Sequence, residues 1–146
     1  MVYIFDTNIV LHYLRESQLS QDIENQLHPF LGENVAVISV VTLGEIRAIT
    51  FRNKWGEKRV SNLEKFLNVF IIADINIEEI IENYAYLDAF SQGKIENDTH
   101  SETARNMGKN NLWIAATTRY LDSLLLTTDK DFSHLNNKFK IRLFEV

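Results

Sequence analysis

Hydrophobic residues in this chain alternate between short continuous runs and longer stretches with helical spacing. The continuous runs are rich in β-branched residues or leucine and cover residues 2–5, 35–38, 69–72 and 124–126. In the longer stretches apolar side chains recur every three or four residues, as at Leu63, Phe66, Leu67 and Phe70 or at Ile77, Ile80, Ile81, Tyr84 and Leu87. Buried strands separated by amphipathic helices indicate a parallel sheet covered by helices. We predict a three-layer α/β/α fold, with a mainly parallel sheet of four to five strands and residues 1–146 in one domain.

Polar residues beside these stretches predict where several elements begin and end. Ser17 or Ser20 reads as the cap of a helix that frays at the lone Pro29, and Asn76 as the cap of the helix over residues 77–87. Residues 141–146 alternate less cleanly, and we predict a last strand there at an edge of the sheet.

Composition narrows the classes of protein to consider. The chain has no Cys, no basic and apolar leader and no apolar stretch of membrane-spanning length, so we expect a cytoplasmic protein without a membrane partner. Its net charge of -5 disfavours tight, sequence-independent binding of long nucleic acid. A carboxylate site that holds a divalent ion would nevertheless reverse the sign of the local charge that a phosphate meets.

Four polar side chains follow or face the ends of the predicted strands. Asp6 follows the first strand, Asp129 follows the fourth, and Glu45 lies about two helical turns beyond the second. Asn111 opens a nearly all-apolar helix, which must be buried and so directs its first turn at the same edge. Because the ends of parallel strands share one edge, we expect these four side chains to meet in one crevice.

Chemistry predicts a metal ion in this crevice. Carboxylates about 4 Å apart repel by roughly 4 kcal/mol per pair at an effective dielectric of 20. They are tolerated together when they are protonated or bound to metal. A set of oxygen ligands alone favours Mg²⁺ or Mn²⁺, which activate water and stabilise charge on a phosphoryl group. The implied reaction is metal-assisted hydrolysis.

The order and context of these motifs resemble the PIN-domain family, most closely the VapC-type ribonuclease toxins. The resemblance covers the chain from Asp6-Thr7-Asn8 through Trp113-Ile114-Ala115-Ala116 to Thr127-Thr128-Asp129. It implies an endoribonuclease that uses Mg²⁺ or Mn²⁺, forms a homodimer and pairs with a cognate antitoxin. Position by position, Asp6, Glu45 and Asp129 match the metal-binding acids, Thr127 a hydroxyl that lines the pocket, and Asn8 a residue that braces it.

Asn111 departs from the family, which usually has Asp at this position. The amide offers one acceptor oxygen and no charge, so we expect weaker metal binding. A natural variant with tuned activity, a chain that has lost catalysis, and a deliberate change to a toxic nuclease all fit this residue. The alternative function is therefore a catalytically inactive PIN domain that binds RNA or a protein.

Other residues offer weaker indications. A basic stretch interleaved with Phe51 and Trp55 either tracks an RNA backbone or is a solvated helical surface; it contains Arg47, Arg52, Lys54, Lys58 and Arg59. Arg105 and Lys109 precede Asn111 closely enough to reach a phosphate in the crevice. We expect Asp131 to cap a short turn over residues 132–135. The four histidines share no motif, and we treat them as ordinary residues.

Overall fold

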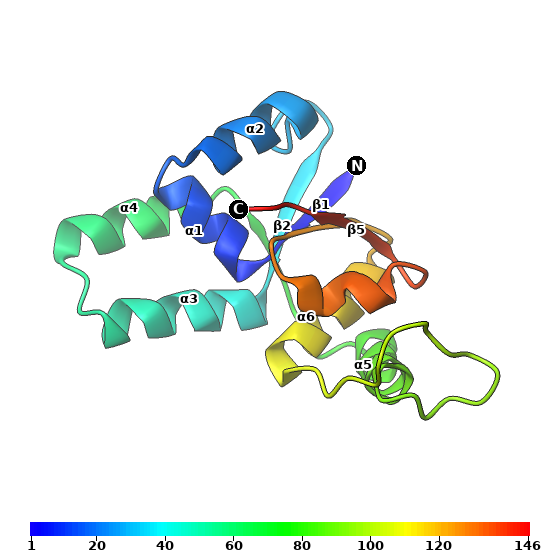
Figure 1. Ribbon diagram of the computed structural model, residues 1–146. Coiled ribbons are helices and arrows are strands. Elements are labelled where there is room, and N and C mark those ends of the chain that lie inside the picture. Colours follow the sequence, from blue (N-terminus) through cyan, green and yellow to red (C-terminus); the bar gives the residue numbers. More distant parts are fainter.

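The computed structural model describes residues 1–146 and has strands and helices in alternation (Figure 1). In chain order the elements are β1 (Val2–Phe5), α1 (Thr7–Leu14), α2 (Gln18–Leu27), β2 (Val35–Ser39), α3 (Val40–Arg52), α4 (Glu57–Leu67), β3 (Ile71–Ala73), α5 (Glu78–Ser91), α6 (Lys109–Tyr120), β4 (Leu124–Thr127), the 3-10 helix η1 (Lys130–Leu135) and β5 (Lys140–Leu143).

All five strands are parallel and form one sheet in the order β3-β2-β1-β4-β5. The chain builds outward from β1 on one side through β2 and β3, and later on the other side through β4 and β5. The direction of building therefore reverses between β1 and β4, and such a reversal is where open α/β sheets leave a crevice beyond the carboxyl ends of their strands. The predicted fold class is confirmed.

Successive residues of the central strands pack into different cores. Tyr3 and Phe5 of β1 belong to a core shared with α1, α2 and α4, while Ile4 belongs to a second core with α5, α6 and η1. This two-residue period is that of an extended strand, and here both faces are buried because helices cover both. Figure 1 shows α1, α2, α3 and α4 to one side of the sheet and α5 and α6 to the other.

The strand predictions are correct for β1 and within a few residues for the others. The third strand begins at Ile71, two residues later than predicted, because Val69 and Phe70 form the turn that leaves α4. Phe70 is still buried, since it packs by its edge against Phe5 at 4.9 Å between ring centroids. The last strand lies at the sheet edge as expected, but it covers Lys140–Leu143.

Two of the predicted helix ends are confirmed and one is wrong. Ser17 caps α2 by accepting a hydrogen bond from the backbone N–H of Ser20 at 3.3 Å, and the helix ends before Pro29. Asn76 does not cap α5; Ile77 stands at that position without a side-chain hydrogen bond. The backbone N–H of Asn76 is instead donated to Asp74, in a turn that precedes the helix. None of the helices combines the length and the apolar composition that a membrane-spanning segment needs.

Candidate active site

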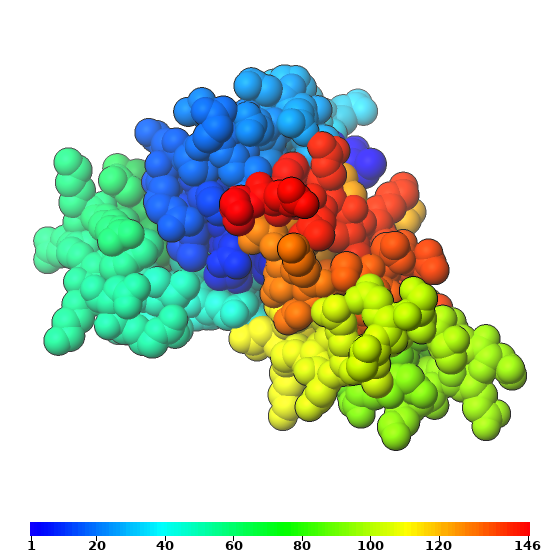
Figure 2. All heavy atoms as spheres, in the orientation of Figure 1, coloured from blue at the N-terminus to red at the C-terminus, as the bar shows by residue number.

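The four predicted positions line one cavity of about 620 Å³. Asp6 comes from the end of β1, Glu45 from α3, Asn111 from the first turn of α6, and Asp129 from the loop after β4. Figure 2 shows these segments, coloured blue, teal, yellow and orange, meeting at the surface. The four side chains therefore meet at the carboxyl edge of the sheet, as expected.

Asp6 is held in place from two sides. It is 5% exposed, and its side chain caps α1 by accepting the backbone N–H of Thr7 at 2.8 Å. Its other oxygen accepts a hydrogen bond from the hydroxyl of Thr127 at 2.6 Å. Thr127 is fully buried and lies behind Asp6 and outside the lining of the cavity, so its hydroxyl orients the carboxylate. The capping and functional interpretations of Asp6 are compatible in one conformation.

Glu45 is braced by Thr7 and not by Asn8. The hydroxyl of Thr7 donates to Oε1 of Glu45 at 3.0 Å, while Oε2 makes no hydrogen bond with the chain. Asn8 lines the cavity, but its exposed side chain forms no hydrogen bond with other residues. Sequence reasoning missed Thr7 because nothing in the spacing shows that a residue at the start of α1 reaches α3.

Asn111 contacts Asp129 through its nitrogen. The amide Nδ2 donates to Oδ2 of Asp129 at 3.1 Å, and a carboxylate can only accept, so the amide oxygen is turned away from that carboxylate. The other oxygen of Asp129 accepts a hydrogen bond from the backbone N–H of Asp131 at 2.9 Å. The backbone N–H of Asp129 donates to the hydroxyl oxygen of Thr127 at 3.0 Å. Asn111 thus satisfies Asp129 with a hydrogen bond where an aspartate would repel it.

The negative charges of Asp6, Glu45 and Asp129 repel one another. Burial raises the pKa of Asp6, and the hydrogen bonds from Thr127 and Thr7 act in the opposite direction. The nearby carboxylates of Asp129 and Glu45 raise it further. The site therefore concentrates negative charge that its own hydrogen bonds do not fully offset, and a cation near Asp6 would be favoured.

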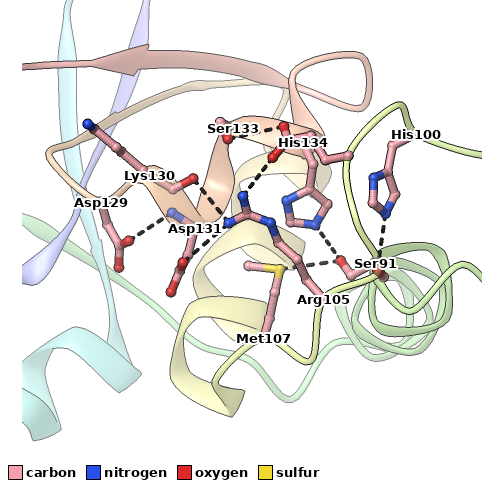
Figure 3. A network of polar contacts seen from close by, with 10 residues as sticks. Ser91, His100, Arg105, Met107, Asp129, Lys130, Asp131, Ser133 and His134 are labelled. Atoms are coloured by element: carbon pink, nitrogen blue, oxygen red, sulfur yellow. Dashed lines mark hydrogen bonds and ion pairs between the residues drawn. The ribbon is translucent and has the colours of Figure 1, made fainter.

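Asp131 and Arg105 support the site from outside the cavity (Figure 3). Asp131 does not cap the turn that follows it, because Asp129 caps η1 instead. Arg105 donates to Glu102 at 2.6 Å and to Asp131 at 3.3 Å, so its guanidinium is already paired. Lys109 opens α6 and is also outside the lining of the cavity. RNA contacts by Arg105 and Lys109 stay a prediction that this geometry does not favour.

A second polar group, which we call the histidine cluster, consists of the buried residues Ser91 and His134 and the half-buried His100. The hydroxyl of Ser91 lies 2.7 Å from Nε2 of His134, and the carbonyl oxygen of Ser91 accepts Nε2–H of His100 at 3.1 Å. Burial lowers the pKa of His134, and nearby His100 and Arg105 lower it further. Figure 3 shows this cluster beside Arg105, on the side away from Asp129. Two of the four histidines are therefore structural, which sequence spacing did not reveal.

The donor set of the cavity suits a hard divalent cation, although the chain does not form a ready-made cage. No three side chains of the His, Cys, Asp or Glu type lie close enough together to hold a metal ion. Mg²⁺ commonly uses only one or two protein carboxylates and completes its shell with water and substrate phosphates. Asp6 and Asp129 meet that requirement, with Glu45 beside them, and all their donor atoms are oxygen.

The fold and site define a parallel α/β domain with acidic side chains gathered at the carboxyl edge of its sheet. Residues 3–138 match the sequence profile of the PIN domain, and the chain belongs to the PIN-domain family. No curated protein sequence matches the chain.

Solved structures with this fold include toxin and antitoxin complexes. VapBC2 from Rickettsia felis, bound to a DNA fragment from its promoter, has a TM-score of 0.75 and 21% identity, covering 99% of this chain and 100% of that chain. VapBC-1 from nontypeable Haemophilus influenzae has a TM-score of 0.74 and 22% identity, covering 98% of each chain. FitAcB from Neisseria gonorrhoeae has a TM-score of 0.71 and 17% identity, covering 97% of this chain and 96% of that chain. At these identities the similarity is one of fold.

Proposed function

We propose that this PIN domain is a metal-dependent endoribonuclease of the VapC type and acts as the toxin of a toxin and antitoxin pair. The observation that carries the proposal is the convergence of Asp6, Glu45, Asp129 and Asn111, from four distant segments, on one cavity. Membership of the PIN-domain family and the VapBC-like fold support it. We further propose that residues 1–146 act as one domain.

The residues of the cavity have separable roles in this proposal. Asp6 and Asp129 would hold Mg²⁺ or Mn²⁺, with Glu45 beside them. The bound ion supplies positive charge for the phosphoryl group and lowers the pKa of water. Thr127 and the N–H of Thr7 fix the orientation of Asp6, so little reorganisation accompanies binding. Oε2 of Glu45, which has no partner within the chain, is free to accept a proton from the attacking water.

One observation favours a second candidate, a PIN domain that binds RNA or protein without cleaving. The amide of Asn111 already satisfies Oδ2 of Asp129, and no group of three acidic side chains is close enough to enclose an ion. A site stabilised in this way needs no metal to keep its shape. Chelation separates the two candidates, because hydrolysis must stop when the metal is removed, whereas a binding module keeps its partner.

The test is RNA cleavage as a function of Mn²⁺ concentration by the chain as it stands and by Asn111→Asp. We expect Asn111→Asp to reach half-maximal cleavage at a roughly tenfold lower Mn²⁺ concentration, because a further charged oxygen ligand, beside Asp6 and Asp129, replaces a hydrogen-bond donor. Asp6→Asn should abolish cleavage in both backgrounds.

Asn110→Asp is the matched control for this experiment. Asn110 is the neighbouring residue and lines the same cavity, but it makes no hydrogen bond with Asp129. Its substitution by aspartate adds the same charge as Asn111→Asp. A general electrostatic effect would make the two variants alike. If neither the original chain nor Asn111→Asp binds Mn²⁺ or cuts RNA, the nuclease proposal is wrong.

The proposed partners are RNA, a cognate antitoxin and a second copy of the chain. One solved structure with this fold is described as a toxin-antitoxin complex from Klebsiella pneumoniae and another as a member of the VapBC family of toxin-antitoxin systems, which supports the antitoxin. Expression should arrest growth, more strongly for Asn111→Asp, and co-expression of the proposed cognate antitoxin should relieve the arrest. If expression of neither the original chain nor Asn111→Asp slows growth, the toxin role is contradicted, but the nuclease role is not.

A further inference from the structure

One face of α3 leads from the carboxylates to a group of three arginines. The cavity that holds Glu45 also includes Ile49 and Arg52, further along the same helix. A smaller cavity of about 150 Å³ shares Ile49 and is lined by Arg15 and Arg59. We call Arg15, Arg52 and Arg59 the arginine end. The two cavities share Ile49, so the acidic side chains that line the first and the arginines that line the second lie on either side of this residue.

We propose that the arginine end binds the backbone of single-stranded RNA next to the phosphate that lies at the carboxylates. This inference rests on the proposed nuclease function and adds a substrate-binding surface to it. Glu45 and Arg52 are seven positions apart on one helix, which places them on the same face with a separation of roughly 10 Å along the axis. A short run of nucleotides covers that distance, so one strand can contact both ends.

The positive charges of the arginine end form no ion pair within the chain, although the guanidinium of Arg59 packs on the ring of Trp55. The four ion pairs of the structure involve Arg47, Arg105 and Lys138, and none involves the arginine end. All three arginines are exposed, although the chain as a whole carries a net charge of -5. Guanidinium groups that have no carboxylate partner and lie beside the proposed metal site can bind a phosphate backbone.

Aromatic side chains at the same place favour RNA over an acidic protein segment. Phe51 is 83% exposed and adjoins Arg52 at the end of α3, where Figure 1 shows the α3 and α4 arm projecting from the rest of the molecule. The guanidinium of Arg59 lies 3.6 Å from the centre of the Trp55 ring. Arg59 therefore covers one face of Trp55, and Phe51 is the ring that is open to a base. Arginines beside such a ring hold single strands by backbone contact and base stacking. An acidic peptide would use the charges but leave Phe51 without a partner.

The test is binding of a fluorescent single-stranded RNA of about eight nucleotides. It is measured by anisotropy in EDTA, so that no cleavage occurs, at several salt concentrations. We expect Arg52→Gln to weaken binding several-fold and to lower the magnitude of the slope of log K against log salt by about 0.7, the value for one lost phosphate contact on a single strand. Arg52→Lys should keep the slope, because a lysine also provides a point charge for phosphate.

Two further variants separate charge from stacking. Phe51→Ala should weaken binding roughly tenfold with no change in the salt slope, because it removes a stacking surface and no charge. Lys94→Gln removes one exposed charge just after α5, away from both cavities, and should leave the affinity and the slope as they are. Thermal melting of each variant checks that the fold is intact.

Equal affinity and equal slope for Arg52→Gln and Lys94→Gln would overturn the inference, as would the absence of RNA binding by the unaltered chain at low salt. Polyglutamate serves as a probe for an acidic protein. If Arg52→Gln loses affinity for polyglutamate while its RNA binding is unchanged, the arginine end binds an acidic protein and the inference is wrong. Binding that depends on Arg52 without any cleavage in Mn²⁺ would contradict the nuclease proposal alone. Cleavage with binding that is insensitive to Arg52 would contradict this inference alone.

Discussion

The histidine cluster and Asp129 of the cavity lie on opposite sides of Arg105 (Figure 3), and the two regions differ in how their polar groups are balanced. In the histidine cluster, Ser91 and His134 face each other as neutral groups in a sealed interior. In the cavity, Asp6, Glu45 and Asp129 bring like charges together beside solvent. In the first arrangement the hydroxyl of Ser91 and Nε2 of His134 satisfy each other, while Nδ1 of His134 and Nδ1 of His100 have no hydrogen-bond partner. The second leaves repulsion that a cation would relieve, which is typical of a binding site.

The largest effect is expected from breaking the sealed cluster. His134→Ala removes a buried side chain and leaves the hydroxyl of Ser91 without its partner, so we expect a loss of about 3 kcal/mol in the free energy of unfolding. Urea denaturation measures this loss. A loss below about 1 kcal/mol would show that the cluster is no more than a well-tolerated contact.

Asn111→Asp should turn a satisfied contact of the cavity into a repulsive one. Two carboxylates would then face each other where the amide of Asn111 now donates to Asp129, and we expect a loss of about 2 kcal/mol in EDTA. Mn²⁺ should restore the loss in this variant, because an ion that binds only the folded state stabilises it. Asn110→Asp is again the control, and equal Mn²⁺ dependence of the two melting temperatures would contradict the role given to Asn111.

Asp6→Asn should act in the opposite direction to His134→Ala. It removes a buried charge that Glu45 and Asp129 repel, so we expect a gain of about 1 kcal/mol at neutral pH in EDTA, together with the loss of cleavage. Differential scanning calorimetry measures the gain. A variant that is less stable than the original chain at pH 7 would show that the hydrogen bonds from Thr127 and Thr7 outweigh the repulsion.

The two clusters also predict opposite responses to pH. The pKa of Asp6 is raised by burial, so its ionised form weakens the fold at pH values above its folded pKa, and the advantage of Asp6→Asn should vanish as the pH falls towards 3.8. The pKa of His134 is lowered by burial, so its contribution is complete above 6.5 and is lost as the pH falls below that value. Melting temperatures of Asp6→Asn and His134→Ala across this range check both signs.

The smallest effect is expected from Arg105, which joins the two clusters. Its ion pairs with Glu102 and Asp131 are partly exposed, so Arg105→Gln should cost about 0.5 kcal/mol. Chemical denaturation is again the measurement. A loss as large as that of His134→Ala would mean that the carboxylates and the histidines behave as one network instead of two.

Local patterns predicted the sheet and the positions at its edge, because strand runs and parallel topology together determine where Asp6, Glu45 and Asp129 emerge. The contacts that orient these side chains were not predictable in the same way. Thr7 braces Glu45 across 38 positions, and Ser91 meets His134 across 43. Such pairs depend on how helices pack, and neither spacing nor residue type reports that packing.

The errors at element ends have a similar origin. Asn76 and Asp131 both have the side chain of a typical cap, yet the backbone conformation places Ile77 and Asp129 at those positions. The residue at the capping position is the one before the first closed helical turn. Packing of the helix against the sheet determines where that turn lies.

The pairing of β1 with β4 has a consequence for how the protein is made. Asp6 accepts a hydrogen bond from the hydroxyl of Thr127, which lies 121 positions later in the sequence. Asp129 comes just after Thr127, at the end of the strand that pairs with β1. Contacts at such sequence separation form late, because a long loop must close first. On a translating ribosome the N-terminal segments can begin to fold, but the cavity cannot assemble until Asp129 has emerged. The cavity of a nascent chain is therefore incomplete until nearly all of these residues have been synthesised.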